Sequence, residues 1–173
     1  ERRGQKLIDK KGAAEMMPRL VEQGSTLGFI ADQDAGRKGI FVDFFGRKAS
    51  TYKSIGLVAL TYNVPIVVGY SRRVGNRFFF EMGVSRIIFP HEWADKEDPL
   101  TWVTAEYTKG IEAFVREDPT QYWWLHRRWK TRPKEERRKA ERKVTSSDRG
   151  DQPAPVLQLE ASGSSISMSQ VTG

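Results

Sequence analysis

The sequence predicts an α/β fold in which helices flank a layered, partly parallel sheet. Two observations carry this prediction. The apolar segments 26–31 and 64–70 are short and bounded by turn-forming residues, as buried strands are. Segments 52–62 and 99–116 repeat apolar residues at three- and four-residue spacing, which is typical of helices that bury one face. The length of 173 residues suits one domain with its own hydrophobic core.

Further elements are expected along the chain. The predicted helices cover residues 13–23, 52–62, 99–116 and 119–126. The predicted strands cover residues 26–31, 40–45, 64–70, 77–82 and 84–89, with polar loops at 32–39 and 90–98. The alternation of strands with helices favours strands that are at least partly parallel.

Capping residues define several helix boundaries. Ser50 or Thr51 can accept hydrogen bonds from the first free N–H groups of the helix that follows, and Asn63 ends that helix. Asp98 and Pro99 form a helix-start pair, with the Asp side chain as the cap and Pro at the first helical position.

Positive charge is concentrated in one segment. Residues 127–143 hold ten Lys or Arg and three Glu, which accounts for the whole formal net charge of +7. We therefore expect a globular part at 1–130, a basic surface segment at 131–145 that can be helical, and a disordered Ser/Gly/Gln-rich tail at 146–173. The absence of cysteine excludes disulfides, thiolate zinc sites and cysteine nucleophiles. No apolar run approaches the ~20 residues that span a bilayer.

Two carboxylates, Asp32 and Asp34, follow the predicted strand at 26–31. Three interpretations fit them: solvated acids that cap a turn, oxygen ligands for Mg²⁺ or Mn²⁺ as in the DxD signature of sugar-nucleotide transferases, or groups that bind a substrate head group. Arg72 follows the strand at 64–70 and reaches the same sheet edge if the two strands are parallel neighbours. Arg72 then either pairs with Asp34 or binds an anionic head group.

Two aromatic stretches have more than one interpretation. Phe44 and Phe45, just before Gly46, either pack in the core or line an apolar cleft. Residues 122–132 interleave three tryptophans with basic residues. That composition suits single-stranded nucleic acid, an anionic lipid surface, or packing beneath a charged helix, and it does not separate the three.

Four boxes occur in order along the chain: Asp32 to Gly46, Ala49 to Thr51, Val64 to Val68, and Pro119 to Pro133. Together they resemble the bacterial lipid A biosynthesis (lauroyl/myristoyl) acyltransferases, within the lysophospholipid acyltransferase superfamily. The resemblance implies a glycerol-3-phosphate acyltransferase-like fold, of which residues 1–130 are the C-terminal part. It implies transfer of an acyl chain from acyl-acyl carrier protein or acyl-CoA to a hydroxyl of a lipid A precursor. The reaction needs no cofactor and takes place at the cytoplasmic face of the bacterial inner membrane.

The catalytic base of this family is the histidine of a His-x-x-x-x-Asp/Glu box, in which the carboxylate orients the imidazole. Neither His91 nor His126 has a carboxylate five residues downstream. The resemblance therefore implies that the box, together with an N-terminal membrane helix, lies upstream of Glu1. It also implies that this chain is the C-terminal half of the enzyme and is inactive alone.

The resemblance assigns roles to particular residues. The expected substrate-binding set is Arg3, Asp32, Asp34, Gly36, Phe44, Phe45, Gly46 and Arg72. The set expected to contact an anionic membrane surface is Trp123, Trp124, Arg127, Arg128, Trp129 and Lys130. No metal ligand is expected, and nucleic acid is not an expected partner. Asp43 departs from the family pattern, which more often has proline before Phe-Phe.

Two competing hypotheses follow from the residues alone. The first is a metal-dependent glycosyl or phosphoryl transferase that uses Asp32 and Asp34 and is inhibited by EDTA. The second is a non-enzymatic module that binds membranes or nucleic acid through the basic, Trp-rich segment, with strong salt dependence.

Overall fold

The computed structural model describes residues 4–9 and 12–148, so Arg3 and most of the predicted tail lie outside the described residues. The chain divides into two compact units, Glu1–Lys134 and Glu135–Gly173. The helices are α1 (Ala13–Glu22), α2 (Ser54–Tyr62), α3 (Pro90–Trp93), α4 (Pro99–Glu117) and α5 (Lys134–Asp148). The strands are β1 (Ile40–Phe44), β2 (Arg47–Thr51), β3 (Ile66–Arg73) and β4 (Phe80–Ile88). Short 3-10 helices are η1 (Gly36–Lys38), η2 (Pro119–Gln121) and η3 (Trp124–His126).

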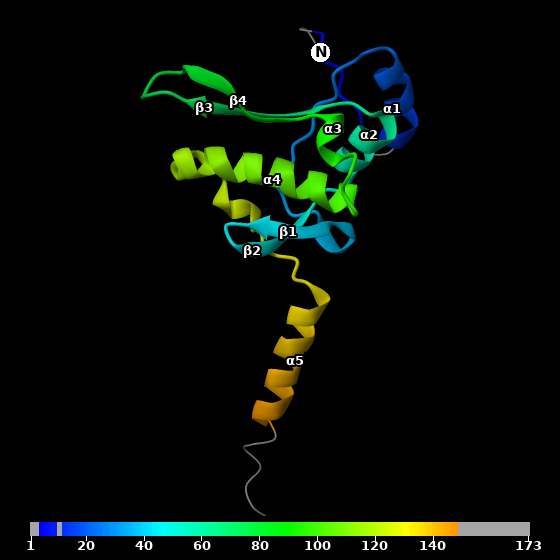
Figure 1. The fold of residues 1–173 in the computed structure, drawn as a ribbon. Coiled ribbons are helices and arrows are strands. Elements are labelled where there is room, and N and C mark those ends of the chain that lie inside the picture. The colour runs from blue at the N-terminus through cyan, green and yellow to red at the C-terminus, as the bar shows by residue number, and fades with distance from the viewer. Residues whose placement is uncertain (1–3, 10–11, 149–173) are drawn as a thin grey trace, which may run out of the picture. The chain divides into compact units, whose positions relative to one another are not determined.

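Helix α4 is the element around which the first unit is built. The β1–β2 hairpin lies along one side of it and the β3–β4 hairpin along the other (Figure 1). The helix begins as predicted, because the Asp98 side chain accepts a hydrogen bond from the Thr101 N–H at 3.0 Å. Its buried apolar residues recur every four positions and form the centre of the core: Val103, Tyr107, Ile111 and Val115.

Strands β1 and β2 pair antiparallel through the two-residue turn Phe45-Gly46. Both turn residues have a positive φ, 53° and 71°, as a type I′ turn requires. For a residue with a side chain this conformation costs about 1–2 kcal/mol. Contacts offset that cost, because the Phe45 N–H donates to Glu112 Oε2 of α4 at 2.6 Å and the Phe45 ring packs against Phe44. The turn is thereby anchored to α4.

Strands β3 and β4 form a second antiparallel hairpin, paired along its length. Val68 and Ile88 on its inner face are buried in the core with α4. Gly110 of α4 permits this close approach, since a Cβ at that position would lie 3.1 Å from the side chains of Val68 and Arg86. The Ser85 hydroxyl donates to the Gly110 carbonyl oxygen at 2.9 Å.

The chain mixes helix and sheet, in keeping with the α/β prediction, but the described strands pair only antiparallel and only within each hairpin. The predicted strand at 26–31 is wrong. That segment has no strand partner among the described residues, and Ile30 is exposed. A strand requires a neighbour for its backbone groups. The parallel pairing expected between 26–31 and 64–70 is accordingly absent from the part of the chain that the structure describes.

Several boundaries are also corrected. Ser50 and Thr51 do not cap a helix: they end β2 with buried side chains, and α2 begins after Lys53. The two strands predicted at 77–82 and 84–89 are the single strand β4. The helix predicted at 119–126 is replaced by η2 and η3. The predicted bounds of α1, α2 and α4 are confirmed to within two residues.

The basic segment is helical from Lys134 to Asp148 and forms the described part of the second unit. Within residues 4–9 and 12–148, no helix has both the length and the apolar character needed to cross a membrane.

Candidate functional site

The loop that carries Asp32 and Asp34 is contacted by the segment 122–131, although 90 or more residues separate the two in sequence. The Tyr122 hydroxyl donates to the backbone carbonyl oxygen of Asp32 at 2.9 Å. At the other end of the segment, the Thr131 hydroxyl donates to Asp34 at 2.7 Å. Tertiary contacts therefore join two of the boxes identified in the sequence.

The carboxylate of Asp34 organises this loop. Its Oδ2 accepts hydrogen bonds from the Gly36 N–H at 3.2 Å and from the Thr131 hydroxyl at 2.7 Å. Its Oδ1 accepts from the Thr131 N–H at 3.3 Å. Gly36 has a positive φ of 71°, which a residue without a Cβ adopts at little cost. Asp34 thus uses its acceptor capacity on donors of its own chain.

Asp32 is in a different situation. Its Oδ1 is buried and has no hydrogen-bond partner among the described residues. A buried acceptor left without a donor costs about 1–3 kcal/mol, and such atoms are uncommon in folded proteins. In the described part of the chain, this oxygen therefore keeps an unused acceptor position.

Tyr122 holds the backbone of Asp32 and is itself partly buried. Burial raises the pKa of Tyr122 to about 12, and the negative charge of Asp32 acts in the same direction. The phenol consequently stays protonated at neutral pH and remains a hydrogen-bond donor to the Asp32 carbonyl oxygen.

Arg128 lies inside the fold and is only 3% exposed. Its guanidinium donates to the Ser50 carbonyl oxygen and, at 2.6 Å, to the Thr51 hydroxyl. It also lies over the Phe44 ring, 5.3 Å from the centroid. Burial lowers the pKa of Arg128, while nearby tyrosines and aspartates act in the opposite direction. The prediction that Arg128 contacts a membrane surface is wrong, because β2 and the core occupy its side chain.

The two phenylalanines of the turn differ in exposure. Phe44 is fully buried, with the rings of Phe45, Tyr122 and Trp129 at centroid distances of 4.8, 6.1 and 5.6 Å. Of its two interpretations, packing in the core is the one that the burial of Phe44 supports. Phe45 is half-buried and has the ring of Trp124 at 6.1 Å. Phe45 and the exposed Gly46 thus lie nearer the surface than Phe44.

The remaining residues predicted to contact a membrane divide into two groups. Trp123, Trp124, Arg127 and Lys130 are exposed, as such a contact requires. Trp129 is half-buried, and its Nε1–H donates to the backbone carbonyl oxygen of a β2 residue at 3.4 Å. Exposure alone does not identify a partner for the first group.

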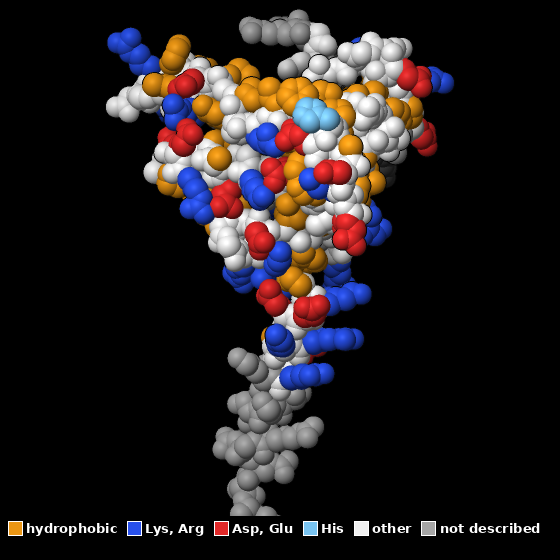
Figure 2. All heavy atoms as spheres, in the orientation of Figure 1, with side chains coloured by type: hydrophobic (Ala, Val, Ile, Leu, Met, Phe, Trp, Pro, Cys, Tyr) orange, Lys and Arg blue, Asp and Glu red, His pale blue; other side chains and the backbone are white. Residues whose placement is uncertain are grey.

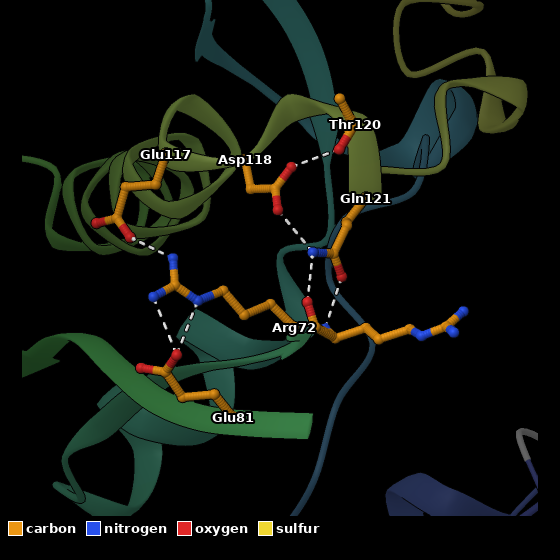
Figure 3. Close-up of polar contacts among 7 residues, drawn as sticks. Arg72, Glu81, Glu117, Asp118, Thr120 and Gln121 are labelled. Atoms are coloured by element: carbon orange, nitrogen blue, oxygen red, sulfur yellow. Dashed lines mark hydrogen bonds and ion pairs between the residues drawn. The ribbon is translucent and has the colours of Figure 1, made fainter. Parts of the chain in front are cut away.

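Arg72 lies apart from Asp34. Its guanidinium pairs with Glu81 of β4 at 3.0 Å and with Glu117 of α4 at 3.6 Å (Figure 3). The hydrogen bond to Glu81 is the main reason that the pKa of Arg72 is raised. The Asp34–Arg72 pair expected from parallel strands is therefore wrong. An anionic head group would have to displace these two carboxylates to reach Arg72.

The donor set gives no support to a metal-dependent site. In the described part of the chain, no three side chains of the His, Asp and Glu types gather where they could hold one ion. Of the two carboxylates in the DxD-like pair, Asp34 already accepts three hydrogen bonds from its own chain.

Sequence reasoning missed the residues that hold the site together. Tyr122 and Thr131 belong to the C-terminal box but were not assigned to Asp32 and Asp34, and Glu112 was not assigned to the turn at Phe45. Their side chains can form the same hydrogen bonds with many partners. No spacing rule identifies a contact between residues 90 or 97 positions apart.

The comparisons with known proteins identify the class. Residues 1–131 match the model of the family described as bacterial lipid A biosynthesis acyltransferase. The chain therefore belongs to this family of enzymes, and the suspected resemblance is confirmed.

Three relatives give the scale of the similarity. The chain is 29% identical over 134 residues to the lipid A biosynthesis lauroyltransferase of Escherichia coli (strain K12), covering 76% of this chain and 42% of that protein. It is 30% identical over 132 residues to a lipid A biosynthesis acyltransferase of Haemophilus influenzae, covering 75% and 41%. It is 30% identical over 116 residues to the E. coli lipid A biosynthesis palmitoleoyltransferase, covering 65% and 36%. The chain thus spans about two fifths of the length of the first two relatives.

Proposed function

We propose that the enzyme to which this chain belongs transfers a fatty acyl chain from a thioester donor to a hydroxyl group of a lipid A precursor. The donor is acyl-acyl carrier protein or acyl-CoA. The observation that carries the proposal is the family match over residues 1–131, which includes both the Asp32–Gly46 box and the segment that contacts it. The names of the relatives, an acyltransferase and a lauroyltransferase of lipid A biosynthesis, indicate the same reaction class.

The chemistry divides between this chain and the rest of the enzyme. The acceptor hydroxyl oxygen attacks the thioester carbonyl while a general base removes the hydroxyl proton; the carbon–sulfur bond then breaks, and the leaving sulfur takes that proton and departs as the donor's free thiol. No histidine of this sequence has the His-x-x-x-x-Asp/Glu spacing. We therefore assign the base to protein outside this chain and assign acceptor positioning to the described site.

Asp32 is the residue that we assign to the acceptor. Its buried Oδ1 has no donor in the part of the chain that the structure describes, and a hydroxyl or amide N–H of the glycolipid head group can supply one. The Tyr122 hydroxyl fixes the backbone of Asp32, and the Asp34–Thr131 contacts fix the loop two residues further on. A loop held in this way orients the acceptor before reaction, which is a large part of what an enzyme contributes to a two-substrate transfer.

We also infer that the two hairpins are parts of a larger layered sheet of the glycerol-3-phosphate acyltransferase type, at the cytoplasmic face of the inner membrane. The outer side of β3–β4 supports this, because Val67, Val84 and Ile87 are exposed there although they have the composition of a core strand. Figure 2 shows hydrophobic side chains gathered along that side. The relatives are more than twice as long as the matched region, so they contain enough chain to cover it.

An acyl-transfer assay with the full-length enzyme tests the proposal. The enzyme is incubated with a lipid A precursor and either acyl-acyl carrier protein or acyl-CoA, and the glycolipid is analysed by mass spectrometry. The expected result is a mass increase of one acyl chain that EDTA does not prevent. Absence of transfer to any glycolipid or lysophospholipid acceptor would contradict the proposal. Loss of activity in EDTA with recovery in Mn²⁺ would favour the metal-dependent alternative.

A further inference from the structure

The end of the β3–β4 hairpin exposes large aromatic side chains. Phe78 is 93% exposed and Phe79 is 63% exposed. Val74 is also exposed, and we call these three residues the aromatic tip. Figure 1 shows the turn at the free end of the hairpin. Exposed apolar side chains grouped in this way are typical of a surface that contacts another apolar phase.

Two cationic side chains accompany the aromatic tip. The Arg73 guanidinium donates to the backbone carbonyl oxygens of Asn76 at 2.7 Å and Arg77 at 3.0 Å. Among the described residues, neither Arg73 nor Arg77 has a carboxylate within ion-pair distance. The positive charge of both is therefore available to an anion, whereas that of Arg72 is neutralised by Glu81 and Glu117.

The hairpin is held firmly below this tip. The Gln121 side chain bonds to both backbone groups of Arg73: its Oε1 accepts from the N–H at 2.6 Å, and its Nε2 donates to the carbonyl oxygen at 2.9 Å (Figure 3). Gln121 is in turn fixed by Asp118 at 2.6 Å. The Val74 N–H donates to the Phe79 carbonyl oxygen at 2.9 Å and closes the turn. The aromatic side chains are thus presented by a fixed backbone.

We propose that the aromatic tip binds an anionic lipid bilayer, with Phe78 and Phe79 in the headgroup–acyl boundary and Arg73 and Arg77 at the lipid phosphates. Apolar side chains gain from leaving water, and nearby cations gain from a negative surface. A deformable anionic surface suits a turn with protruding rings and unpaired cations. This proposal goes beyond acyl transfer, because it depends on no step of that reaction.

Vesicle binding by the full chain tests the proposal. Binding is measured with phosphatidylcholine vesicles that contain or lack phosphatidylglycerol, without donor or acceptor. We expect binding to the anionic vesicles. The variant Phe78→Ser/Phe79→Ser should lower the partition coefficient about tenfold or more, and Arg73→Gln/Arg77→Gln should lower it only on anionic vesicles. Because no acyl substrate is used, failure here leaves the acyl-transfer assay as an independent result.

A matched control removes exposed apolar side chains elsewhere. Met16→Ser/Leu57→Ser alters α1 and α2, where both residues are exposed, and should change binding less than twofold. Circular dichroism checks that each variant is folded. Three results would overturn the proposal: unchanged binding by Phe78→Ser/Phe79→Ser, an equal loss in the control variant, or a change in oligomeric mass with vesicle binding unaffected. The last would assign the aromatic tip to contacts between copies of the chain.

Depth measurement gives a second, independent readout. The sequence has no cysteine, so Asn76→Cys in the turn introduces a unique site for a nitroxide label. With vesicles present, the label should become inaccessible to a water-soluble relaxant and accessible to oxygen. The same label at Asp43→Cys, an exposed position of β1, should stay in water. A label at residue 76 that stays in water on bound protein would also contradict the proposal.

Discussion

Two carboxylates that are two positions apart have opposite environments. Asp34 accepts three hydrogen bonds from Gly36 and Thr131, whereas Asp32 has a buried oxygen without a donor among the described residues. One carboxylate therefore stabilises the loop, and we propose that the other binds the acceptor. The sequence predicted that both matter, but the division of labour depends on Thr131, 97 residues away.

Replacing Asp34 tests the structural role. In Asp34→Asn the amide NH₂ cannot accept, so at least one donor among Gly36 and Thr131 loses its partner. We expect the free energy of unfolding to fall by about 1–3 kcal/mol, measured by urea denaturation. Asp43→Asn is the matched control, because Asp43 lies on the surface and its side chain pairs with exposed Lys48 at 3.0 Å. Its effect should stay below about 0.5 kcal/mol, and equal effects would refute the assigned role.

The decrease of the free energy of unfolding at alkaline pH tests the burial of Tyr122. Its pKa is raised to about 12 in the folded state, above the ordinary value of 10.0 for a tyrosine phenol. Between these values the unfolded chain loses the phenolic proton while the folded chain keeps it. The contribution of Tyr122 is therefore fully present below pH 10 and is lost as the pH rises through about 12.

The measurement is the free energy of unfolding as a function of pH. Tyr122→Phe should be less stable at neutral pH, because the hydrogen bond to the Asp32 carbonyl oxygen is lost. The free energy of unfolding of this variant should also fall less steeply above pH 10, the ordinary pKa of the phenol. Tyr107 titrates in the same direction through burial, so some slope remains. An alkaline limb identical to that of the wild type would contradict the raised pKa.

At the scale of elements, substitutions of two helix glycines distinguish the effect of close packing on stability from the effect of helix propensity. Gly→Ala in a helix interior ordinarily stabilises by up to about 1 kcal/mol. At Gly110, however, a Cβ would meet Val68 and Arg86 at 3.1 Å, where β3–β4 packs on α4. At Gly56 it would meet Leu100 Cδ1, the far end of a flexible side chain, at 2.9 Å.

We therefore expect opposite signs from two chemically identical substitutions. Gly110→Ala should lower the free energy of unfolding by about 1 kcal/mol, because overpacking outweighs propensity. Gly56→Ala should be neutral or stabilising. Thermal and urea unfolding of both variants provide the measurement. Stabilisation by Gly110→Ala would show that the hairpin does not pack closely on α4.

The elements that could be predicted from the sequence are those marked by a pattern of neighbouring residues, such as apolar periodicity or a helix cap. Helices α2 and α4 have periodic apolar faces, and Asp98-Pro99 marks a start that the Thr101 N–H confirms. Strand β2 was missed because Ser50 and Thr51 also suit a helix cap, and only pairing with β1 decides between the two. The segment 26–31 was wrongly assigned for the same reason, since apolar composition does not supply a strand partner.

At the scale of the molecule, our proposal gives this chain one side of a site. It matches about two fifths of the length of its relatives, and its sequence contains no His-x-x-x-x-Asp/Glu box. The ordered boxes identified the family from sequence. The burial of Arg128 could be found only from the structure, because a basic residue within a basic segment is ordinarily at the surface.

We expect residues 1–173 alone not to catalyse acyl transfer, because neither histidine of this sequence has the His-x-x-x-x-Asp/Glu spacing of the proposed base. The measurement compares product formation by this chain and by the full-length enzyme under the same conditions. Turnover by the isolated chain above the uncatalysed rate would show that a base exists among these residues, and the division of labour proposed above would be wrong.

The most direct measurement is the steady-state kinetics of full-length Asp32→Asn beside full-length Asp43→Asn, with the glycolipid acceptor varied. If Asp32 accepts a hydrogen bond from the acceptor, Asp32→Asn should lower kcat/KM for the acceptor by about tenfold or more, with an unchanged thermal midpoint. Asp43→Asn should match the wild type. Wild-type kinetics in Asp32→Asn, or equal losses in both variants, would contradict the assignment of Asp32 to the acceptor.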